Sequence, residues 1–596
     1  MRRIYLLLTL LSLSLLQACN SFFDQMPDDQ LTLDLVFQSK QYSEEFLAHA
    51  YSYVRDEADR KGGVPFDPLS DDFDVPYSES PAYPLNIGNW NAASGNYNFW
   101  HDYYRGIRQA TYFILHIEEN RELQGMAGGP QLIKQYKAEA RFLRAFFYFN
   151  LLRQYGPVII IGDEIIDSDL EGSDPKMNLP RMPYDACVDY IVSELDLAAV
   201  DLPLHFTAQS ERDYGRATKV ACMAVKSRLL LYAASPQFNG NTEYVDVNNP
   251  DGTPLFNTQY DATKWERAAK AAKDLIDLDI LGLYKVAGDD GNIDPYRSYR
   301  DIFLTPWNNE VLFARKNSDL GWPYEKHTAP RPIGGWPSYS ITQQLVDAYE
   351  TASGKRIDEP GTDYVENGFS QADGKYTEAG TYMMYVNREP RFYVTVLYNG
   401  SYYPSRVNGD QRMEFFRTGS SGRDGARDYP HTGYIVGKNV SPNSDVRNSQ
   451  FISRPYILYR YAEVLLSYVE ALNESSPGHP DIATYLNAIR ERAGLPGVPE
   501  SLGQSEMRER IRHERRIELA IENLRWSDTR RWKIADQTDG GEFWGMNTGA
   551  GTSLHDPAYY QRTVFERRVF RKEYYLFPIP QSEMDRNSNL VQNPGW

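Results

Sequence analysis

Cysteine is scarce in this chain: Cys19, Cys187 and Cys222 are the only three among 596 residues. So few cysteines exclude the disulfide framework that small secreted domains use in place of a large core. Cys187 and Cys222 fall within apolar patterns of helical spacing. We therefore expect both to be buried free thiols that behave as small hydrophobic residues, with a disulfide as the alternative.

Long hydrophobic runs are absent after the N-terminus. The one such run, IYLLLTLLSLSLL, follows two arginines and has 13 residues, fewer than the ~20 that cross a bilayer. This arrangement predicts a signal peptide over residues 1–18. The last residue of this run begins the sequence LQAC (16–19), which resembles a bacterial lipobox. This resemblance predicts that Cys19 is acylated and becomes the mature N-terminus. Ordinary cleavage nearby, with loss of Cys19, is the alternative.

Blocks of positive charge are also absent. The chain has 81 acidic and 63 basic residues, a formal net charge of -18. Nucleic-acid phosphates require a basic stripe, so we expect no nucleic-acid partner. A neutral or cationic partner suits this composition better. Charged residues at 24% and apolar residues at 41% are ordinary for a globular protein.

Catalytic motifs are missing as well. The nine histidines are scattered, and no His-Glu-x-x-His, Gly-x-Ser-x-Gly or phosphate-loop motif occurs. We expect no enzyme activity, although a glycosidase-like pair of carboxylates among so many acidic residues stays open. Residues 246–253 and 288–294 only partly resemble cation-binding loops. We therefore expect no cofactor, with a structural Ca²⁺ as the alternative.

What the chain does have is helical periodicity. Apolar residues recur at spacings of three and four in eight long segments, which is typical of amphipathic helices. Small alanines on two of them would let neighbouring helices approach closely, as in tetratricopeptide stacking, although no clean 34-residue repeat occurs. The eight segments are 97–120, 131–156, 183–200, 217–235, 261–278, 456–474, 481–494 and 506–526.

Two irregular tracts interrupt the helices, residues 64–98 and about 296–453, both rich in Pro, Gly, Asn and aromatic residues. Loops this long are uncommon in compact domains unless they are functional. Within the second tract, the alternation around Asn399-Gly400 predicts a β-hairpin with a two-residue type I′ turn.

Several blocks resemble the SusD/RagB family, and they occur in that family's order. The blocks are AEARFLRAFFYFNLLRQYGPV (138–158), RYAEVLLSYVEALNE (460–474), AIRERAGLP (488–496), RIRHERRIELAIENLRWSDTRRW (510–532) and YLFPIPQSEMDRNSNLVQNPGW (575–596). Two departures indicate a divergent member. Asn523-Leu524 stands where the family favours a Gly-His-like pair, and YETASGKRI lacks the Asp that often precedes its Gly-Lys.

The resemblance implies a mainly α, SusD-like fold with four tetratricopeptide-like helix pairs plus long loops and short β-hairpins. Residues 19–596 would form one unit, with an N-terminal helical half (19–240, binding loop 64–98) and a C-terminal half (241–596, loop-rich insert 296–453). The protein would be a lipid-anchored, surface-exposed lipoprotein of the outer membrane. It would capture oligosaccharides for a SusC-like TonB-dependent transporter. A peptide-binding lid of the same architecture and, less favoured, a surface glycosidase are the alternatives.

Sugar capture needs a flat aromatic face for the C–H side of a ring and a few polar groups for its hydroxyls. We therefore expect ligand contacts from both tracts, although any one of these aromatics could instead pack beneath its own loop. Arg331 could bracket hydroxyls or an acidic sugar, and Asp72 could accept two hydroxyl hydrogen bonds. The predicted site residues are Asp72, Trp90, Asn96, Trp322, Tyr324, Arg331 and Trp336.

A row of carboxylates on the 506–526 segment invites a catalytic interpretation. Glu514, Glu518 and Glu522 recur every fourth residue and alternate with arginines. We favour structural pairing between adjacent helices over a catalytic role.

Overall fold

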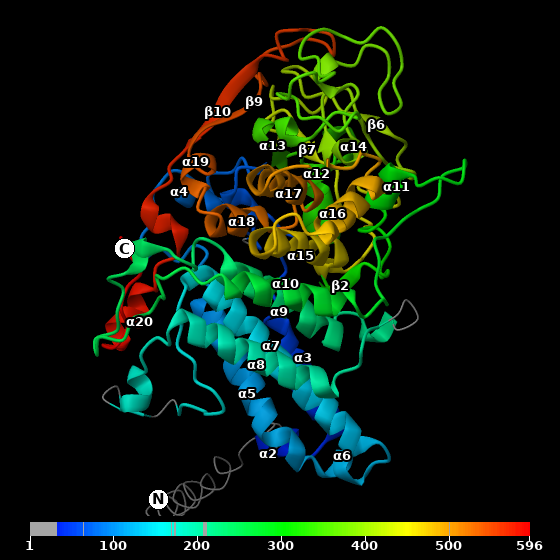
Figure 1. Ribbon diagram of the computed structural model, residues 1–596. Helices are drawn as coiled ribbons and strands as arrows, with labels where there is room; N and C mark the ends of the chain where they lie inside the picture. Colours follow the sequence, from blue (N-terminus) through cyan, green and yellow to red (C-terminus); the bar gives the residue numbers. More distant parts are fainter. Residues whose placement is uncertain (1–32, 64, 168–169, 172–173, 207–210, 500) are drawn as a thin grey trace, which may run out of the picture.

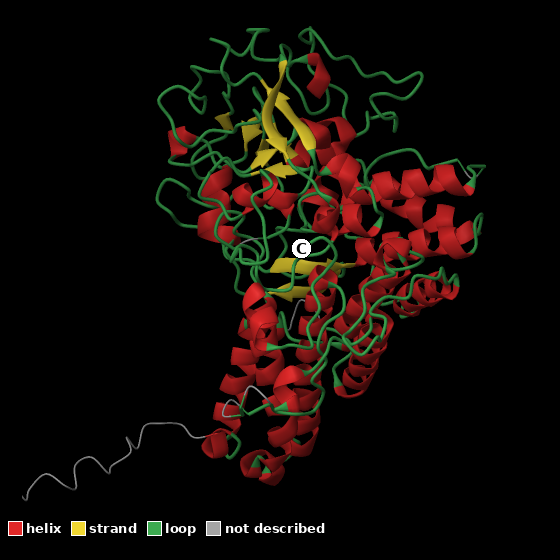
Figure 2. Ribbon diagram, turned by 90° about the vertical axis from the view of Figure 1, so that its left-hand side faces the viewer, coloured by secondary structure: helices red, strands yellow, loops and turns green. Residues whose placement is uncertain are grey.

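The computed structural model describes residues 33–63, 65–167, 170–171, 174–206, 211–499 and 501–596. The predicted signal peptide and Cys19 lie outside the described residues. Figures 1 and 2 show a helical lobe below a lobe rich in loops and short strands. Among the described helices, none combines the length and hydropathy needed to cross a membrane.

The helical lobe is a layered stack in which consecutive long helices contact one another, so that α3 packs on α5, α5 on α7, α7 on α8, α8 on α9, and α9 on α10. α10 then packs on α15, which lies some 180 residues further along the chain and contacts α16 and α17. Each of the eight predicted segments overlaps one of these helices, whereas α3 was not predicted. The long helices are α3 (Lys40–Ser52), α5 (Trp100–His116), α7 (Gly129–Tyr155), α8 (Tyr184–Asp201), α9 (Lys219–Ala234), α10 (Thr263–Ile276), α15 (Tyr461–Ser475), α16 (Pro480–Arg492) and α17 (Gln504–Glu518).

Shorter helices lie at the ends of this stack and throughout the upper lobe (Figure 1). They are α2 (Leu33–Val36), α4 (Ala82–Asn86), α6 (Arg121–Gly125), α11 (Pro295–Arg300), α12 (Lys326–Thr328), α13 (Gln343–Ala348), α14 (Pro390–Thr395), α18 (Arg525–Arg531), α19 (Ala535–Thr538) and α20 (Gln581–Arg586).

Local sequence sets the helix ends and the close packing. The Thr218 side chain accepts a hydrogen bond from the backbone N–H of Ala221, which caps the start of α9. α7 stops at Gly156, whose φ of 70° lies in the region that glycine tolerates best. Cys187 and Cys222 are buried free thiols, as predicted. The large core formed by these helices includes residues on both sides of residue 240, because α9 and α10 pack together.

The strands of the described chain form five two-stranded antiparallel sheets. Two of them connect distant parts of the sequence: β2 pairs with β8, and β1 pairs with β3 through the register Phe73↔Ile341. The pairs are β1 (Phe73–Asp74) with β3 (Ser340–Ile341), β2 (Val311–Arg315) with β8 (Tyr456–Arg460), β4 (Val396–Leu397) with β7 (Ile435–Val436), β5 (Tyr402–Tyr403) with β6 (Gln411–Arg412), and β9 (Gly541–Met546) with β10 (Arg562–Arg568).

The predicted hairpin at Asn399-Gly400 was wrong. The strands that flank the turn do not pair with each other, because β4 pairs with β7 and β5 with β6. Gly400 has a φ of 98°, but Asn399 is not among the described residues with positive φ. A type I′ turn needs positive φ at both central residues, so this turn is of the type II kind. Much of the preceding alternation belongs to α14 instead of a strand.

The predicted carboxylate row is a buried ion network that joins the helical lobe to the insert. Glu518 accepts hydrogen bonds from Arg460 at 2.7 Å and from Arg391 at 2.9 Å, and it also pairs with Arg492. Burial alone would raise the pKa of Glu518, but these cations outweigh it and hold the pKa well below its usual range. The preference for structural pairing is confirmed.

Glu522 departs from the prediction because α17 ends at Glu518. The chain then turns through Ile521 and Asn523, which have φ values of 60° and 62°. Asparagine tolerates this left-handed conformation better than most residues, and this explains how it can replace a glycine at position 523.

Candidate functional site: a cleft with two tryptophans

A cleft of about 630 Å³ opens in the upper lobe, where four separate stretches of the chain meet. We call it the tryptophan cleft. The charged and aromatic side chains that line it are Asp59, Lys61, Glu79, Trp322, His327, Trp336, Arg427 and Asp428.

Two indole rings form the apolar part of the cleft. Trp322 is 51% exposed and Trp336 is 37% exposed, and their rings lie 5.8 Å apart at 90°. Exposed fractions this large are unusual for tryptophan, because burial of an indole ring contributes a large hydrophobic free energy. The pair presents two perpendicular apolar faces to a ligand.

The backbone holds both rings in place. Trp322 lies on the π-helical turn η6 (Leu320–Glu325), a kind of turn that is frequent at functional sites. The backbone N–H of Trp336 donates a hydrogen bond to the Lys326 carbonyl at 2.7 Å. A Cβ at Gly335 would lie 2.0 Å from the Ala329 carbonyl oxygen, so only glycine fits there. Rings that are fixed before binding lose less entropy when the ligand arrives.

His327 supports the cleft from behind. Its ring stacks on Tyr339 at 4.8 Å and 16°, and its Nδ1 lies 2.7 Å from the Ser338 hydroxyl. Burial, together with the nearby Lys61 ammonium, lowers the pKa of His327 to about 4. The imidazole is therefore neutral at pH 7 and acts as an uncharged wall.

The rim of the cleft is polar. Asp59 accepts hydrogen bonds from the Tyr339 hydroxyl at 2.9 Å and from the Lys61 N–H at 3.0 Å. Glu79 pairs with Lys61 at 3.6 Å and with Arg427. A hydrogen bond from its own N–H, with Arg427 and Lys61 nearby, lowers the pKa of Glu79. A lowered pKa keeps the Glu79 carboxylate ionised, so that its oxygens accept hydrogen bonds.

Of the predicted residues in the second tract, Trp322 and Trp336 lie in the cleft, whereas the other two have supporting positions. Tyr324 is fully buried and donates its hydroxyl hydrogen to the Lys438 carbonyl at 2.7 Å. Arg331 donates to the carbonyls of Ser420 at 3.0 Å and Asp428 at 3.1 Å. Its guanidinium therefore fastens the loop that carries the rim, and the structure does not support a ligand contact for it.

In the first tract, Trp90 is part of the core. It is 8% exposed, and its ring lies 4.8 Å from Tyr574, 4.5 Å from Phe577 and 4.8 Å from Trp596. The aromatic C-terminal segment covers it, and no sugar could stack there. Trp90 is therefore not part of the candidate site, and Trp100 at the start of α5 is also buried.

Asp72 is likewise buried, and its Oδ1 accepts hydrogen bonds from Arg516 Nη2 at 2.6 Å and Nε at 2.9 Å. Burial raises the pKa of Asp72 to about 6 despite this partner. It serves an interior ion pair, not the predicted hydroxyl contacts. Asn96 is partly exposed in the same tract but does not line the tryptophan cleft.

The rim residues were missed because no local pattern marks them. Glu79 belongs to the first predicted tract and Arg427 and Asp428 to the second, but Asp59 and Lys61 precede both. Each is an ordinary charged loop residue in the sequence. Only the fold brings them to one rim.

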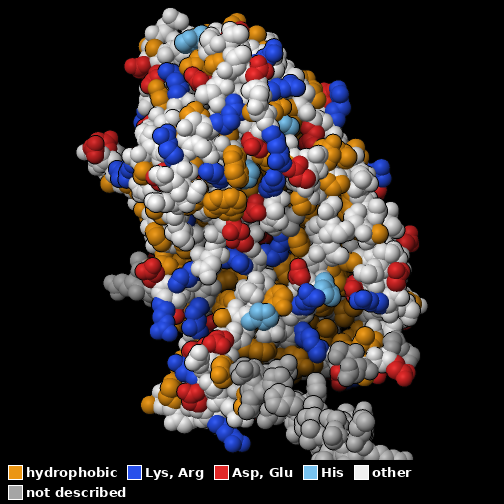
Figure 3. Space-filling model, turned by 180° about the vertical axis from the view of Figure 1, so that it is seen from behind, with side chains coloured by type: hydrophobic (Ala, Val, Ile, Leu, Met, Phe, Trp, Pro, Cys, Tyr) orange, Lys and Arg blue, Asp and Glu red, His pale blue; other side chains and the backbone are white. Residues whose placement is uncertain are grey.

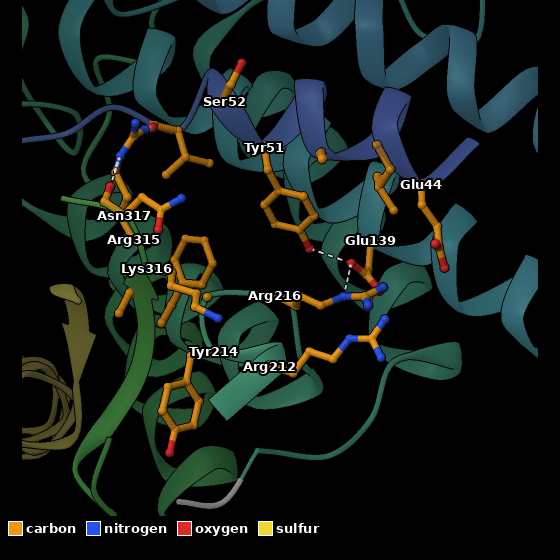
Figure 4. A pocket seen from close by; sticks show the side chains of 16 residues that line it. Glu44, Tyr51, Ser52, Glu139, Arg212, Tyr214, Arg216, Arg315, Lys316 and Asn317 are labelled. Atoms are coloured by element: carbon orange, nitrogen blue, oxygen red, sulfur yellow. Dashed lines mark hydrogen bonds and ion pairs between the residues drawn. The ribbon is translucent and has the colours of Figure 1, made fainter. Parts of the chain in front are cut away.

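A second cavity, of about 450 Å³, lies between α3, residues 212–216 and β2 (Figure 4). Glu139, its buried carboxylate, already has partners within the protein. The Tyr51 hydroxyl donates to Glu139 at 2.8 Å, and Arg216 Nε donates to the same carboxylate at 3.1 Å. The ring of Tyr214 is stacked on Trp307 at 4.6 Å and 11°. This cavity therefore has less free aromatic surface than the tryptophan cleft.

Charges of both signs are mixed on the visible surface. On the face in Figure 3, Lys and Arg side chains are interspersed with Asp and Glu, and the described part of this face has no extended stripe of either sign.

The chain matches two family descriptions. Residues 306–596 match the SusD family, and residues 21–231 match a family described as starch-binding and associating with the outer membrane. SusD-like protein P2 of Formosa agariphila is 39% identical over 157 residues, which cover 25% of this chain and 27% of that protein.

Longer matches have lower identity. A SusD-like protein of Bacteroides ovatus is 23% identical over 97% of this chain and 96% of its own length. The solved structure of a SusD-like carbohydrate binding protein from Bacteroides fragilis has a TM-score of 0.70 at 24% identity, covering 93% of this chain and all of that one. The ordered sequence blocks, the mainly α fold and these matches agree: the chain belongs to the SusD/RagB family of carbohydrate-binding proteins that associate with the outer membrane.

Proposed function

We propose that this protein captures oligosaccharides at the tryptophan cleft and delivers them to a SusC-like TonB-dependent transporter. It does so without catalysis, from the cell surface, tethered by an acylated Cys19. The observation that carries the proposal is the perpendicular, exposed pair Trp322 and Trp336 above a polar rim.

The cleft has the chemistry that a sugar requires. The C–H face of a pyranose packs on an indole, and its hydroxyls can exchange hydrogen bonds with Asp59, Asp428 and the Lys61 ammonium. Two rings at a right angle can contact two successive sugar units or both sides of a bend. Charges of both signs on the rim favour a neutral glycan, in agreement with the net charge.

The lipid anchor would keep the protein beside its transporter. Tethering converts repeated encounters into an intramolecular step and raises the effective concentration of the partner. Several acyl chains on one cysteine hold far more firmly than one, because each buried CH₂ contributes about 0.8 kcal/mol. A Cys19→Ser variant should leave the outer-membrane fraction, as immunoblotting of cell fractions would reveal. Retention of that variant in the membrane would argue against the anchor.

The central test is native affinity electrophoresis in gels that contain soluble starch, β-glucan, xylan, galactomannan or pectin. We expect at least one polysaccharide to retard the wild-type protein and the double variant Trp322→Ala/Trp336→Ala to lose at least tenfold in affinity. Trp544→Ala is the matched control, because Trp544 is 36% exposed on β9 and does not line the cleft.

Other results would favour the alternatives. Binding of peptides but of no polysaccharide would indicate the peptide-binding lid, and release of products during an overnight digest would indicate a glycosidase. The transporter can be sought by purifying the tagged protein from detergent-solubilised outer membranes of the native bacterium. Recovery without any TonB-dependent transporter would contradict the delivery step.

A further inference from the structure

A third cavity, of about 470 Å³, lies within the insert, between α11, the loop 373–381 and the segment around β5. Its walls are unusually rich in one residue type, and we call it the tyrosine pocket. The tyrosines that line it are Tyr296, Tyr376, Tyr393, Tyr398 and Tyr402.

Three of these rings form a column along one wall. Tyr376 stacks between the other two, 5.7 Å from Tyr296 at 26° and 4.9 Å from Tyr393 at 36°. None of the three rings is fully buried. Tyr393 is fixed by its hydroxyl, which donates to the Tyr385 carbonyl at 2.8 Å. The column therefore keeps partly open ring surface on a rigid support.

Tyr402 contributes a separate ring that is 41% exposed. Its hydroxyl reaches Glu378 at 3.4 Å, and the Arg412 guanidinium holds the same carboxylate at 3.2 Å and lies 5.4 Å from the Tyr402 ring. The arrangement orients the ring without covering it. Gly400, with a φ of 98°, makes the turn that brings β5 to this wall.

Polar groups with unused hydrogen-bonding capacity surround the rings. Among the described residues, neither the Tyr376 hydroxyl nor the Lys375 ammonium forms a hydrogen bond within the protein. The ammonium lies 5.2 Å from the Tyr376 ring. Asp373, Thr377 and Glu378 add carboxylate and hydroxyl oxygens to the lining. Open aromatic faces beside mixed donors and acceptors are the chemistry of a carbohydrate site.

We propose that the tyrosine pocket is a second carbohydrate-binding site, which holds another stretch of the glycan chain that the tryptophan cleft captures. This rests on the proposed function, because it assumes a glycan ligand. The two sites share no lining residue. A polysaccharide long enough to occupy both would be retained much more firmly than a short oligosaccharide, because the second contact is intramolecular.

The test uses three variants of the whole protein in the same affinity gels: the cleft variant Trp322→Ala/Trp336→Ala, the pocket variant Tyr376→Ala/Tyr402→Ala, and Tyr260→Ala. Tyr260 is the matched control because it is 63% exposed and lines neither site. If the double pocket variant does not keep the wild-type circular dichroism spectrum, Tyr402→Ser alone replaces it, since that ring is already exposed.

We expect the pocket variant to lose about tenfold or more in affinity for each polysaccharide that retards the wild type, as loss of a bivalent contact predicts. Titration calorimetry with a hexasaccharide of that polymer should give two sites per wild-type chain and one in either variant. The Tyr260→Ala protein should match the wild type.

Two results overturn the second site. A single site in the wild type, with unchanged polysaccharide affinity in the pocket variant, removes it while the proposed function stands. A wild-type protein that no polysaccharide retards overturns the proposed function and the second site together. Residual retention of the cleft variant, abolished by adding the pocket substitutions, would support the second site.

Discussion

Two loop tracts of this protein have similar composition but opposite roles. Residues 64–98 and residues 322–339 are both rich in Pro, Trp, Tyr and polar residues. In the first, Trp90 is 8% exposed, whereas in the second, Trp322 and Trp336 are 51% and 37% exposed. The difference comes from a third, distant segment, because the C-terminal aromatics cover Trp90. Composition therefore identifies candidate aromatic surface, and the packing of remote segments decides whether it stays open.

The first tract nevertheless supports the site. β1 of the first tract pairs with β3, which directly follows the second tract, and Asp71 anchors the first tract to α17 and α18 through Arg516 and Arg525. Further along the same tract, Glu79 reaches the cleft rim. The buried first tract therefore supports the position of the exposed second tract.

Trp90→Ala should have the largest effect on stability. Removal of a buried indole leaves a cavity among Tyr574, Phe577 and Trp596, and the free energy of unfolding should fall by about 4 kcal/mol. Urea denaturation followed by circular dichroism measures this change. The affinity of the folded fraction for polysaccharide should be unchanged. A Trp90→Ala protein that has wild-type stability but does not bind polysaccharide would show that Trp90 acts in binding and not in the core.

Asp71→Asn should come next. Asp71 accepts hydrogen bonds from Arg525 Nε at 2.7 Å and from Arg516 Nη2 at 3.0 Å, in a buried setting. Loss of its charge leaves these guanidinium groups undercompensated, and the free energy of unfolding should fall by about 3 kcal/mol. Asp424→Asn is the matched control, because its pair with Arg417 is exposed and should contribute less than about 1 kcal/mol. Equal losses in both variants would contradict the anchoring role.

The cleft wall should show a smaller, pH-dependent effect. His327 is neutral in the folded protein, with a pKa of about 4, and the unfolded chain protonates it near 6.5. The unfolded state therefore binds more protons between these values, and stability falls as the pH falls. This group alone accounts for about 2 kcal/mol between pH 7 and pH 5. Comparison of His327→Gln with the wild type across this range should reveal a shallower pH dependence. Identical slopes would mean that His327 does not contribute.

Trp322→Ala should have the smallest effect on stability and a clear effect on binding. Its indole is already half in water, so the free energy of unfolding should change by less than about 0.5 kcal/mol. Affinity for the retarding polysaccharide should fall about tenfold, which corresponds to about 1.4 kcal/mol. Calorimetry and urea denaturation of one preparation measure both. A large loss of stability would show that Trp322, like Trp90, contributes to the core.

Much of the fold was predictable from local sequence. The eight helical segments were found by their apolar periodicity, because each helix buries one face against its neighbours and this repeats every 3.6 residues. The hairpin at Asn399-Gly400 failed because a turn signal does not specify which strands will pair, and β4 and β5 each found a different partner. Trp322 and Trp336 were found by composition, but the charged rim of the cleft was not.

By itself the sequence determined eight of the nine long helices of the described chain, the free buried thiols, the pairing of Glu514 and Glu518 with arginines, and the family. Each depends on neighbours along the chain or on ordered blocks of residues. Only the tertiary structure decided which tryptophans stay open, which charges meet at the rim, and that five tyrosines line one pocket. Those features depend on contacts between residues hundreds of positions apart, and such contacts leave no periodic pattern in the sequence.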